Sequence, residues 1–240
     1  MSARWRFGWI TVAALLALAM TLALGRWQLS RAAQKEALQA SLDSKAALPA
    51  LEGQTWALSG NPADALDRGV TLRGRWLASR TVFLDNRPMN GRAGLYVLTP
   101  MVLEGSAAVV LVQRGWVPRN FVDRMSVPRI ETPLGVVEIR GRIAPAPAKL
   151  YAFGGAERSL IRQNLDLAEF SVEIGLPLLR VTVQQLGAAS DGLLRDWPRA
   201  ATGVDKHYGY AFQWFGLSAL IAILYVWFQI VRRFFLPRRA

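Results

Sequence analysis

Few residues in this chain could carry out chemistry, and one histidine stands apart from the rest. The 240-residue sequence contains a single histidine, His207, and no cysteine. Thiol nucleophiles, iron–sulfur clusters, thiolate zinc sites and disulfides are therefore excluded, and one imidazole alone does not complete a zinc or copper site. Carboxylates stand singly in patterned segments, and the sequence contains no glycine-rich phosphate loop. The composition argues against an enzyme with turnover chemistry of its own.

Helical geometry places aromatic side chains in line with this histidine. At about 100° per residue, positions 207, 214, 218 and 225 fall within roughly 20° of one line along a helix. That line contains His207, Trp214, Ser218 and Tyr225, and Tyr210 flanks it. One axial imidazole backed by flat side chains can hold a planar, partly apolar cofactor such as haem. The alternative is an interfacial histidine whose aromatic neighbours only pack against another helix or form a membrane-surface belt.

Two uncharged stretches predict the elements that must position these residues. They run from Phe7 to Leu24 and from Tyr208 to Val231. A helix needs roughly 20 apolar residues to cross the ~30 Å hydrocarbon layer, and both stretches qualify. The first could instead be a cleaved signal peptide, but it is longer than the usual apolar region of about 7–15 residues. We therefore expect transmembrane helices at residues 7–25 and 207–231.

Basic residues beside the two stretches set the expected orientation. Arg4 and Arg6 precede the first stretch, and Arg232, Arg233, Arg238 and Arg239 follow the second. Because Lys and Arg are enriched in short cytoplasmic flanks, we expect residues 1–6 and 232–240 in the cytoplasm and residues 26–206 in the periplasm. The absence of a long Arg/Ser-rich presequence favours a bacterial inner membrane. The formal charge of +12 is scattered or bunched beside the spans, which favours a lipid bilayer over nucleic acid as partner.

The segment between the spans has the pattern of a mostly β domain. The helical pattern of the first span continues to about Leu42, and Val70–Trp76 then alternates apolar and polar residues, as a half-buried strand does. Further strands are expected at 81–85, 95–103, 107–114, 136–143 and 178–186, with a short helix at 166–174 and a loop at 187–203. Thr99-Pro100 and Val117-Pro118 are among the expected breaks. The prediction is an α+β membrane protein in which two transmembrane helices flank an extracytoplasmic antiparallel β-barrel or sandwich-like domain.

Five short motifs follow one another along the chain. They are Gly25-Arg26-Trp27-Gln28 with Arg31; Val70–Trp76; Leu84–Arg87 with Gly94 and Thr99-Pro100; Val112–Pro118; and His207 with Tyr210 and Trp214–Leu217. In this order they resemble the surfeit-locus (SURF-one, or Shy) family of cytochrome c oxidase assembly factors. Gln113 and Lys206 depart from the family pattern, since each stands where the family usually has Asn.

The resemblance implies a function and a site. It implies an assembly factor for a haem–copper terminal oxidase that binds haem a and aids its insertion into, or retention by, subunit I of cytochrome c oxidase. His207 would be the axial ligand of the haem iron, and Tyr210 and Trp214 would line the haem plane. Enzymes of haem a synthesis are further candidate partners. The alternative is a membrane scaffold that stabilises subunit I without binding haem.

Four other motif residues have both structural and functional interpretations. Trp27 would anchor the first helix at the membrane surface, and Gln28 would hydrogen-bond the neighbouring helix or a partner. Arg87 and Arg114 lie at strand ends, where a guanidinium can hold a carboxylate, including a haem propionate, through two hydrogen bonds. An ordinary ion pair inside the β domain, for example with Asp85, is the alternative for both arginines.

Overall fold

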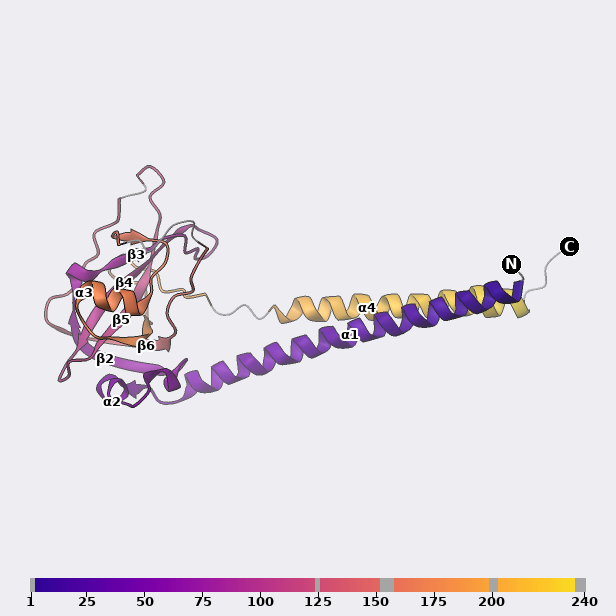
Figure 1. Cartoon of the computed structure of the whole chain (residues 1–240), viewed down its shortest axis with the longest axis horizontal. Helices are drawn as coiled ribbons and strands as arrows, with labels where there is room; N and C mark the ends of the chain where they lie inside the picture. Colours follow the sequence, from indigo (N-terminus) through magenta and orange to yellow (C-terminus); the bar gives the residue numbers. More distant parts are fainter. Residues whose placement is uncertain (1–2, 124–125, 152–157, 199–202, 236–240) are drawn as a thin grey trace. The chain divides into compact units, whose positions relative to one another are not determined.

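The computed structural model describes residues 3–123, 126–151, 158–198 and 203–235. The chain divides into two compact units (Figure 1). One unit comprises residues 1–41 and 200–240, and the other comprises residues 42–199.

Two long helices form the first unit. Helix α1 spans Ala3–Ala47, and helix α4 spans Val204–Tyr225 and continues as a π-helix over Val226–Phe235. Trp5–Ala47 and Val204–Arg232 are long and apolar enough to cross a membrane, and few side chains in their most apolar stretches are buried. Both predicted helices and the predicted continuation to about Leu42 are confirmed. Of the basic flanking residues, Arg238 and Arg239 lie outside the described residues.

The second unit is a β domain whose pairings close on themselves. Its strands are β1 (Leu51–Glu52), β2 (Gly69–Trp76), β3 (Val82–Leu84), β4 (Gly94–Leu103), β5 (Val109–Pro118), β6 (Val136–Ala144), β7 (Ile161–Arg162) and β8 (Leu178–Gln185). They pair in the order β1-β2-β6-β8-β5-β4-β3-β7, and β2 also pairs with β4. The pairings of β2, β6, β8, β5 and β4 therefore return to the strand from which they start. Helices α2 (Gly53–Ala57) and α3 (Leu167–Ile174) complete the domain, with 3-10 turns at Pro62–Ala65 and Ala78–Arg80.

The sheet is mixed, so the prediction of an antiparallel domain is wrong in part. Strand β8 runs parallel to β5, and the short pairs β1–β2 and β3–β7 are also parallel. A parallel pair needs a long crossover, and the chain between β5 and β8, which includes α3, provides one. The expected break at Thr99-Pro100 is also wrong, because Pro100 lies inside β4, whereas the break at Val117-Pro118 is confirmed, because Pro118 ends β5. The β4–β5 register shifts between Val97 and Leu98, and sheets tolerate proline beside such irregularities.

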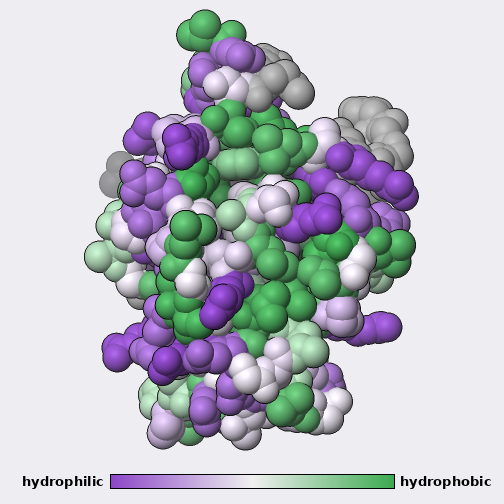
Figure 2. Space-filling view, turned by 90° about the vertical axis from the view of Figure 1, so that its left-hand side faces the viewer, coloured by the Kyte–Doolittle hydropathy of each residue, from purple (hydrophilic) through white to green (hydrophobic). Residues whose placement is uncertain are grey.

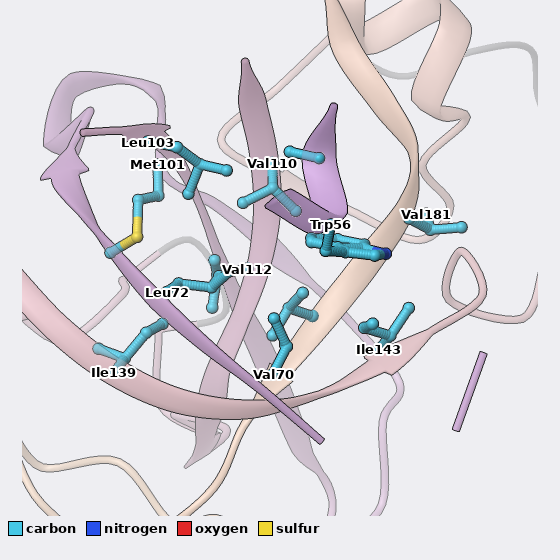
Figure 3. Close-up of a cluster of buried hydrophobic side chains, with 12 residues drawn as sticks. Trp56, Val70, Leu72, Met101, Leu103, Val110, Val112, Ile139, Ile143 and Val181 are labelled. Atoms are coloured by element: carbon cyan, nitrogen blue, oxygen red, sulfur yellow. The ribbon is translucent and has the colours of Figure 1, made fainter. Parts of the chain in front are cut away.

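The main hydrophobic core lies between the paired strands. Alternate residues of β2, namely Val70, Leu72 and Gly74, are buried, while Arg73 and Arg75 on either side of Gly74 are exposed. Trp56 of α2 and residues of the other four strands complete the cluster (Figure 3): Met101, Leu103, Val110, Val112, Ile139, Ile143, Val181 and Val183. Each fully buried aliphatic side chain contributes about 1.5–3 kcal/mol. This burial is the main force that holds the strands together.

Apolar residues also reach the surface of the β domain. Figure 2 shows hydrophobic residues among hydrophilic ones on one face. Several apolar side chains of the domain are more than 70% exposed: Leu58, Phe121, Val122, Leu134, Tyr151 and Val172. Scattered exposed apolar side chains are ordinary in folded proteins, so we assign them no role.

The predicted short helix is confirmed as α3. The Asp166 carboxylate accepts hydrogen bonds from the backbone N–H groups of Ala168 and Glu169, and Gly175 ends the helix with φ of 70°. Glu173 accepts two hydrogen bonds from the buried Arg162 guanidinium, at 2.9 and 3.0 Å. These bonds hold the pKa of the Glu173 carboxyl below its usual value. The pair ties α3 to β7.

We expect Glu173→Gln to lower the unfolding free energy of the β domain by about 1–3 kcal/mol at pH 7, because it removes a charge-assisted pair from a buried guanidinium. Since the folded-state pKa is depressed, the stabilisation is present above the usual glutamate value of 4.5 and is lost as pH falls through the folded-state pKa. Urea unfolding followed by tryptophan fluorescence should show this difference in unfolding free energy between wild type and variant at pH 7. The difference should become smaller below pH 4.5. Glu169→Gln, an exposed change on the same helix, is the control. An equal difference between wild type and variant at pH 7 and below pH 4.5 would contradict a stabilising role of the Arg162–Glu173 pair.

Candidate functional site

The only histidine of the chain contacts a glutamine of the other long helix. His207 lies in the first turn of α4, and its Nδ1 is 2.7 Å from Oε1 of Gln28 on α1. An amide oxygen only accepts hydrogen bonds, so this contact places a proton on Nδ1, and in the neutral imidazole Nε2 then keeps its lone pair. Nε2 forms no hydrogen bond with any described residue, and the imidazole is half-buried. The contact therefore leaves Nε2 without a hydrogen-bond partner among the described residues.

Polar contacts further along the two helices show that α1 and α4 pack antiparallel. The Ser218 hydroxyl donates to Oγ1 of Thr21 at 2.7 Å, and the hydroxyls of Thr11 and Tyr225 lie 2.9 Å apart. As the α1 positions rise from 11 to 21 to 28, their α4 partners fall from 225 to 218 to 207. We call this row of contacts the helix interface. It fixes the register that brings Gln28 opposite His207.

Small side chains let the two helices approach closely. A Cβ atom at Gly25 would lie 2.7 Å from the Phe215 ring, so glycine makes room for that ring. Ala32 and Ala211 are also almost fully buried, as are Thr21 and Ser218. Small residues and interhelical hydroxyl bonds are the usual means of packing helices in a bilayer, where the hydrophobic effect does not drive association. The interface therefore suits a lipid environment.

The predicted line of cofactor-facing residues is divided by the structure. Ser218 and Tyr225 contact α1, so the alternative of a helix-packing face describes that part of the line. Trp214 is half-buried, and its carbonyl accepts a hydrogen bond from Ser218. Tyr210 is 52% exposed. The residues still available to a ligand beside Nε2 are thus Tyr210 and part of Trp214.

The two remaining motif residues of α1 differ in their surroundings. Gln28 points to the neighbouring helix, as one of its two interpretations required. Trp27 is 52% exposed, and its ring lies 5.9 Å from the Arg31 guanidinium. Sequence reasoning missed a second interhelical bond near the site, in which the Tyr208 hydroxyl donates to Glu36 at 3.0 Å. No motif signalled it, because the partners are surface residues on different helices.

Arg87 is buried in the β domain, and no described carboxylate pairs with it. The guanidinium is only 6% exposed and donates to the carbonyls of Ala148 at 2.8 Å and Gln163 at 3.0 Å. Its own carbonyl accepts from the indole of Trp116, which is fully buried. Burial lowers the pKa of Arg87. The suggested pair with Asp85 is wrong, because Asp85 binds Arg119 at 3.0 Å.

Arg114 is also buried, and it fastens two loops to β5. Its guanidinium donates to the Thr132 hydroxyl at 2.7 Å and the Glu131 carbonyl at 2.8 Å, and it lies 3.7 Å from Asp191. It also stacks over the Trp76 ring at 4.7 Å. These contacts leave Arg114 a structural role, and its pairing with Asp85 is not observed. Arg87 and Arg114 belong to the β domain, whereas His207 belongs to the helical unit.

The segment predicted as a plain loop at 187–203 contains buried side chains. Leu194 forms a two-way backbone bridge with Trp116, and the Trp197 indole donates to the Gln185 carbonyl at 2.8 Å. Arg195 shares Asp191 with Arg114 and donates to the Arg114 carbonyl. Two features of the sequence could have indicated these contacts: the presence of Trp197 and the four-residue spacing of Asp191 and Arg195. Residues 199–202 of this segment lie outside the described part of the chain.

Comparison with known proteins gives a consistent set of relatives. A model described as "SURF1 family" matches residues 15–219, which include both Gln28 and His207. A SURF1-like protein of Rickettsia conorii is 26% identical over 219 residues, which cover 85% of each chain. Surfeit locus protein 1 of Rattus norvegicus is 26% identical over 230 residues, covering 88% of this chain and 72% of its own. The cytochrome oxidase assembly protein SHY1 of Saccharomyces cerevisiae is 29% identical over 99 residues, covering 41% of this chain and 25% of its own.

The helix register can be tested with introduced cysteines, because the chain has none of its own. Thr21→Cys combined with Ser218→Cys should form a disulfide under mild oxidation, since the two hydroxyl oxygens lie only 2.7 Å apart. Adding Gly25→Ile should lower the yield by forcing the helices apart at Phe215. Cross-linking is measured by the mobility of maleimide-labelled protein on a denaturing gel.

The matched controls use exposed positions of the same helix. Leu22→Cys with Ser218→Cys should not cross-link, because Leu22 is turned about 100° away from Thr21. Gly8→Ile should leave the yield unchanged, since no atom lies within 4 Å of a Cβ built there. Equal cross-linking through positions 21 and 22 would contradict the helix interface.

Proposed function

The chain belongs to the SURF1 family, and on that premise we propose that it assists the assembly of cytochrome oxidase as a membrane-anchored factor. A relative in yeast carries the name cytochrome oxidase assembly protein. The observation that carries the proposal to particular residues is the contact between Gln28 and His207. These residues come from the first and last of the five motifs, and the fold joins them into one site.

We propose that both long helices cross the bacterial inner membrane, with both termini in the cytoplasm and the β domain in the periplasm. The uncharged stretches of the two helices support this placement, as do the arginines beside them. Helix α1 has 45 residues, more than twice what a bilayer requires, and charged residues recur from Arg26 onward. Gln28 and His207 would then lie where both helices leave the hydrocarbon layer.

Haem a is the cargo that this site suits best. His207 would hold the iron through Nε2, which the Gln28 contact leaves with its lone pair, and Tyr210 and Trp214 would line the ring plane. In metal sites a ligating imidazole almost always donates its other N–H to an oxygen acceptor, which fixes its tautomer and orientation, and Oε1 of Gln28 would be that acceptor here. The chain's role would be to hold and orient the cargo, with no turnover step of its own.

The proposed acceptor is subunit I of cytochrome c oxidase, which would receive or retain haem a with the help of this chain. The β domain would dock to the periplasmic face of that subunit, and enzymes of haem a synthesis would be the donors. A scaffold that stabilises subunit I without haem is the competing function. The free Nε2 atom favours the haem-binding role over the scaffold.

The two functions differ in the visible spectrum of the full-length protein. We expect detergent-purified protein, co-expressed with the enzymes that make haem a, to show a Soret band that His207→Ala abolishes or shifts. Phe212→Leu is the matched control, because it changes an exposed ring of the same helix and leaves the imidazole and the interhelical bonds in place. A colourless wild type that still co-purifies with subunit I would overturn the haem proposal and support the scaffold.

Gln28→Leu tests the role of the amide separately. Without the Oε1 acceptor, either nitrogen of His207 can carry the proton and the ring is free to turn, so haem affinity should fall by about 10- to 100-fold. The measurement is haem titration followed by the Soret band, together with the iron–histidine stretch in resonance Raman spectra. Gln34→Leu, a change of an exposed glutamine on the same helix, should have no effect. Unchanged affinity and stretch in Gln28→Leu would contradict the positioning role.

A further inference from the structure

We propose that the β domain contains a second binding site, a cavity at Arg87 that takes a carboxylate carried on a small apolar body. The cavity has a volume of about 340 Å³. Its lining includes Arg87, Tyr96, Gln113 and Gln184, and the chain segment Ala144–Ala148 forms a wall of alanine and proline. The proposal is independent of haem, because every residue used in it belongs to the β domain.

The Arg87 guanidinium differs from the other buried arginines because no described carboxylate forms an ion pair with it. The other buried arginines of the described chain each lie within 4 Å of a carboxylate: Arg162 of Glu173, and both Arg114 and Arg195 of Asp191. Among the described residues Arg87 has only two backbone carbonyls as side-chain partners, and none of these residues accepts a hydrogen bond from its buried Nε. A buried charge without a counter-ion is costly, and a bound carboxylate would offset that cost.

Two glutamine side chains add hydrogen-bond donors beside the positive charge of Arg87. The Arg142 guanidinium donates to Oε1 of Gln184, the Gln184 amide donates to Oε1 of Gln113, and the Gln113 amide donates to the Thr182 hydroxyl. The acceptor oxygens of both glutamines are thus used within this chain of bonds. Each glutamine keeps a second amide N–H for a ligand, beside a second lone pair on its oxygen.

The burial of Arg87 keeps this donor set rigid. The residue is anchored on both sides, since its N–H donates to the Gly94 carbonyl and its carbonyl accepts from the Trp116 indole. The Tyr96 ring packs edge-on against Trp197 at 5.2 Å. A preorganised donor set loses little entropy when a ligand binds. These features distinguish the cavity from an incidental surface hollow.

Size and polarity define the class of ligand. Since one water takes about 30 Å³ of liquid volume, the cavity has room for roughly ten non-hydrogen atoms. No acidic residue is among the described residues that line it, and most of the lining residues are apolar: alanines, prolines, Leu150 and Tyr96. A phosphate or sulfate would find one cation and apolar walls, whereas a monocarboxylate with an aryl or short alkyl body would match both parts. The carboxylate can belong to a free small molecule or to the C-terminus of a peptide.

The test uses the full-length protein in detergent and 4-fluorobenzoate as the probe. We expect the ¹⁹F transverse relaxation of the probe to rise on binding and to return to its free value when unlabelled benzoate is added. Arg87→Gln should weaken binding at least tenfold. Arg75→Gln, a change of an exposed arginine on β2, should leave binding unchanged.

A second variant keeps the test decisive if Arg87→Gln does not fold. Ala148→Leu adds bulk at the cavity wall and retains the backbone carbonyl that holds Arg87, so it should also weaken binding. The neutral analogue 4-fluorobenzamide should not bind. Equal binding of the amide, or probe binding that neither variant changes, would overturn the proposal. Competition by N-acetyl-alanyl-phenylalanine but not by its C-terminal amide would identify a peptide terminus as the source, and displacement by benzoate alone would identify a small molecule.

Discussion

The contact between Gln28 and His207 joins residues that are 179 positions apart, and it exists only because two helices run back along each other in one register. Gly25 leaves room for the Phe215 ring, and Thr21 bonds to Ser218. A shift of one residue would rotate each side chain by about 100° and separate the imidazole from the amide. The packing of small residues at the helix interface is therefore what brings an amide oxygen to the only histidine.

The β domain follows a different logic, in which a hydrophobic interior is closed by strand pairing and its loops are fixed by buried arginines. The β2–β4 pairing completes the circuit of five strands around the main core. Arg114 and Arg195 share Asp191 and so fasten the 188–195 segment to β5, while Arg162 and Glu173 fasten α3 to β7. Such pairs are costly to break once buried, because the remaining charge has no water around it. Arg87 differs from these arginines, because its partners among the described residues are carbonyls alone.

The same residue types therefore have two uses in one domain. A guanidinium matched by a carboxylate is a structural fastener, and a guanidinium left with neutral partners beside a cavity is a potential receptor for an anion. The helix pair shows a similar division. Ser218 and Tyr225 spend their hydroxyls on the interface, whereas His207 uses one nitrogen for the interface and keeps the other free. In both units, the proposed site lies at a polar group that the packing leaves without a matching partner: Nε2 of His207 and the guanidinium of Arg87.

The sequence by itself determined the two apolar helices, most strands, the α3 helix, the motif set and the isolation of His207, because these depend on local periodicity, composition and chain order. It gave no means to recognise the parallel β5–β8 pair, since strand direction depends on how a long crossover folds back. It left Gln28 with two interpretations and suggested the wrong partner for Arg87 and Arg114. Only the tertiary structure decided these points, because the partner of a polar side chain is set by which distant segments are brought within about 3 Å of it.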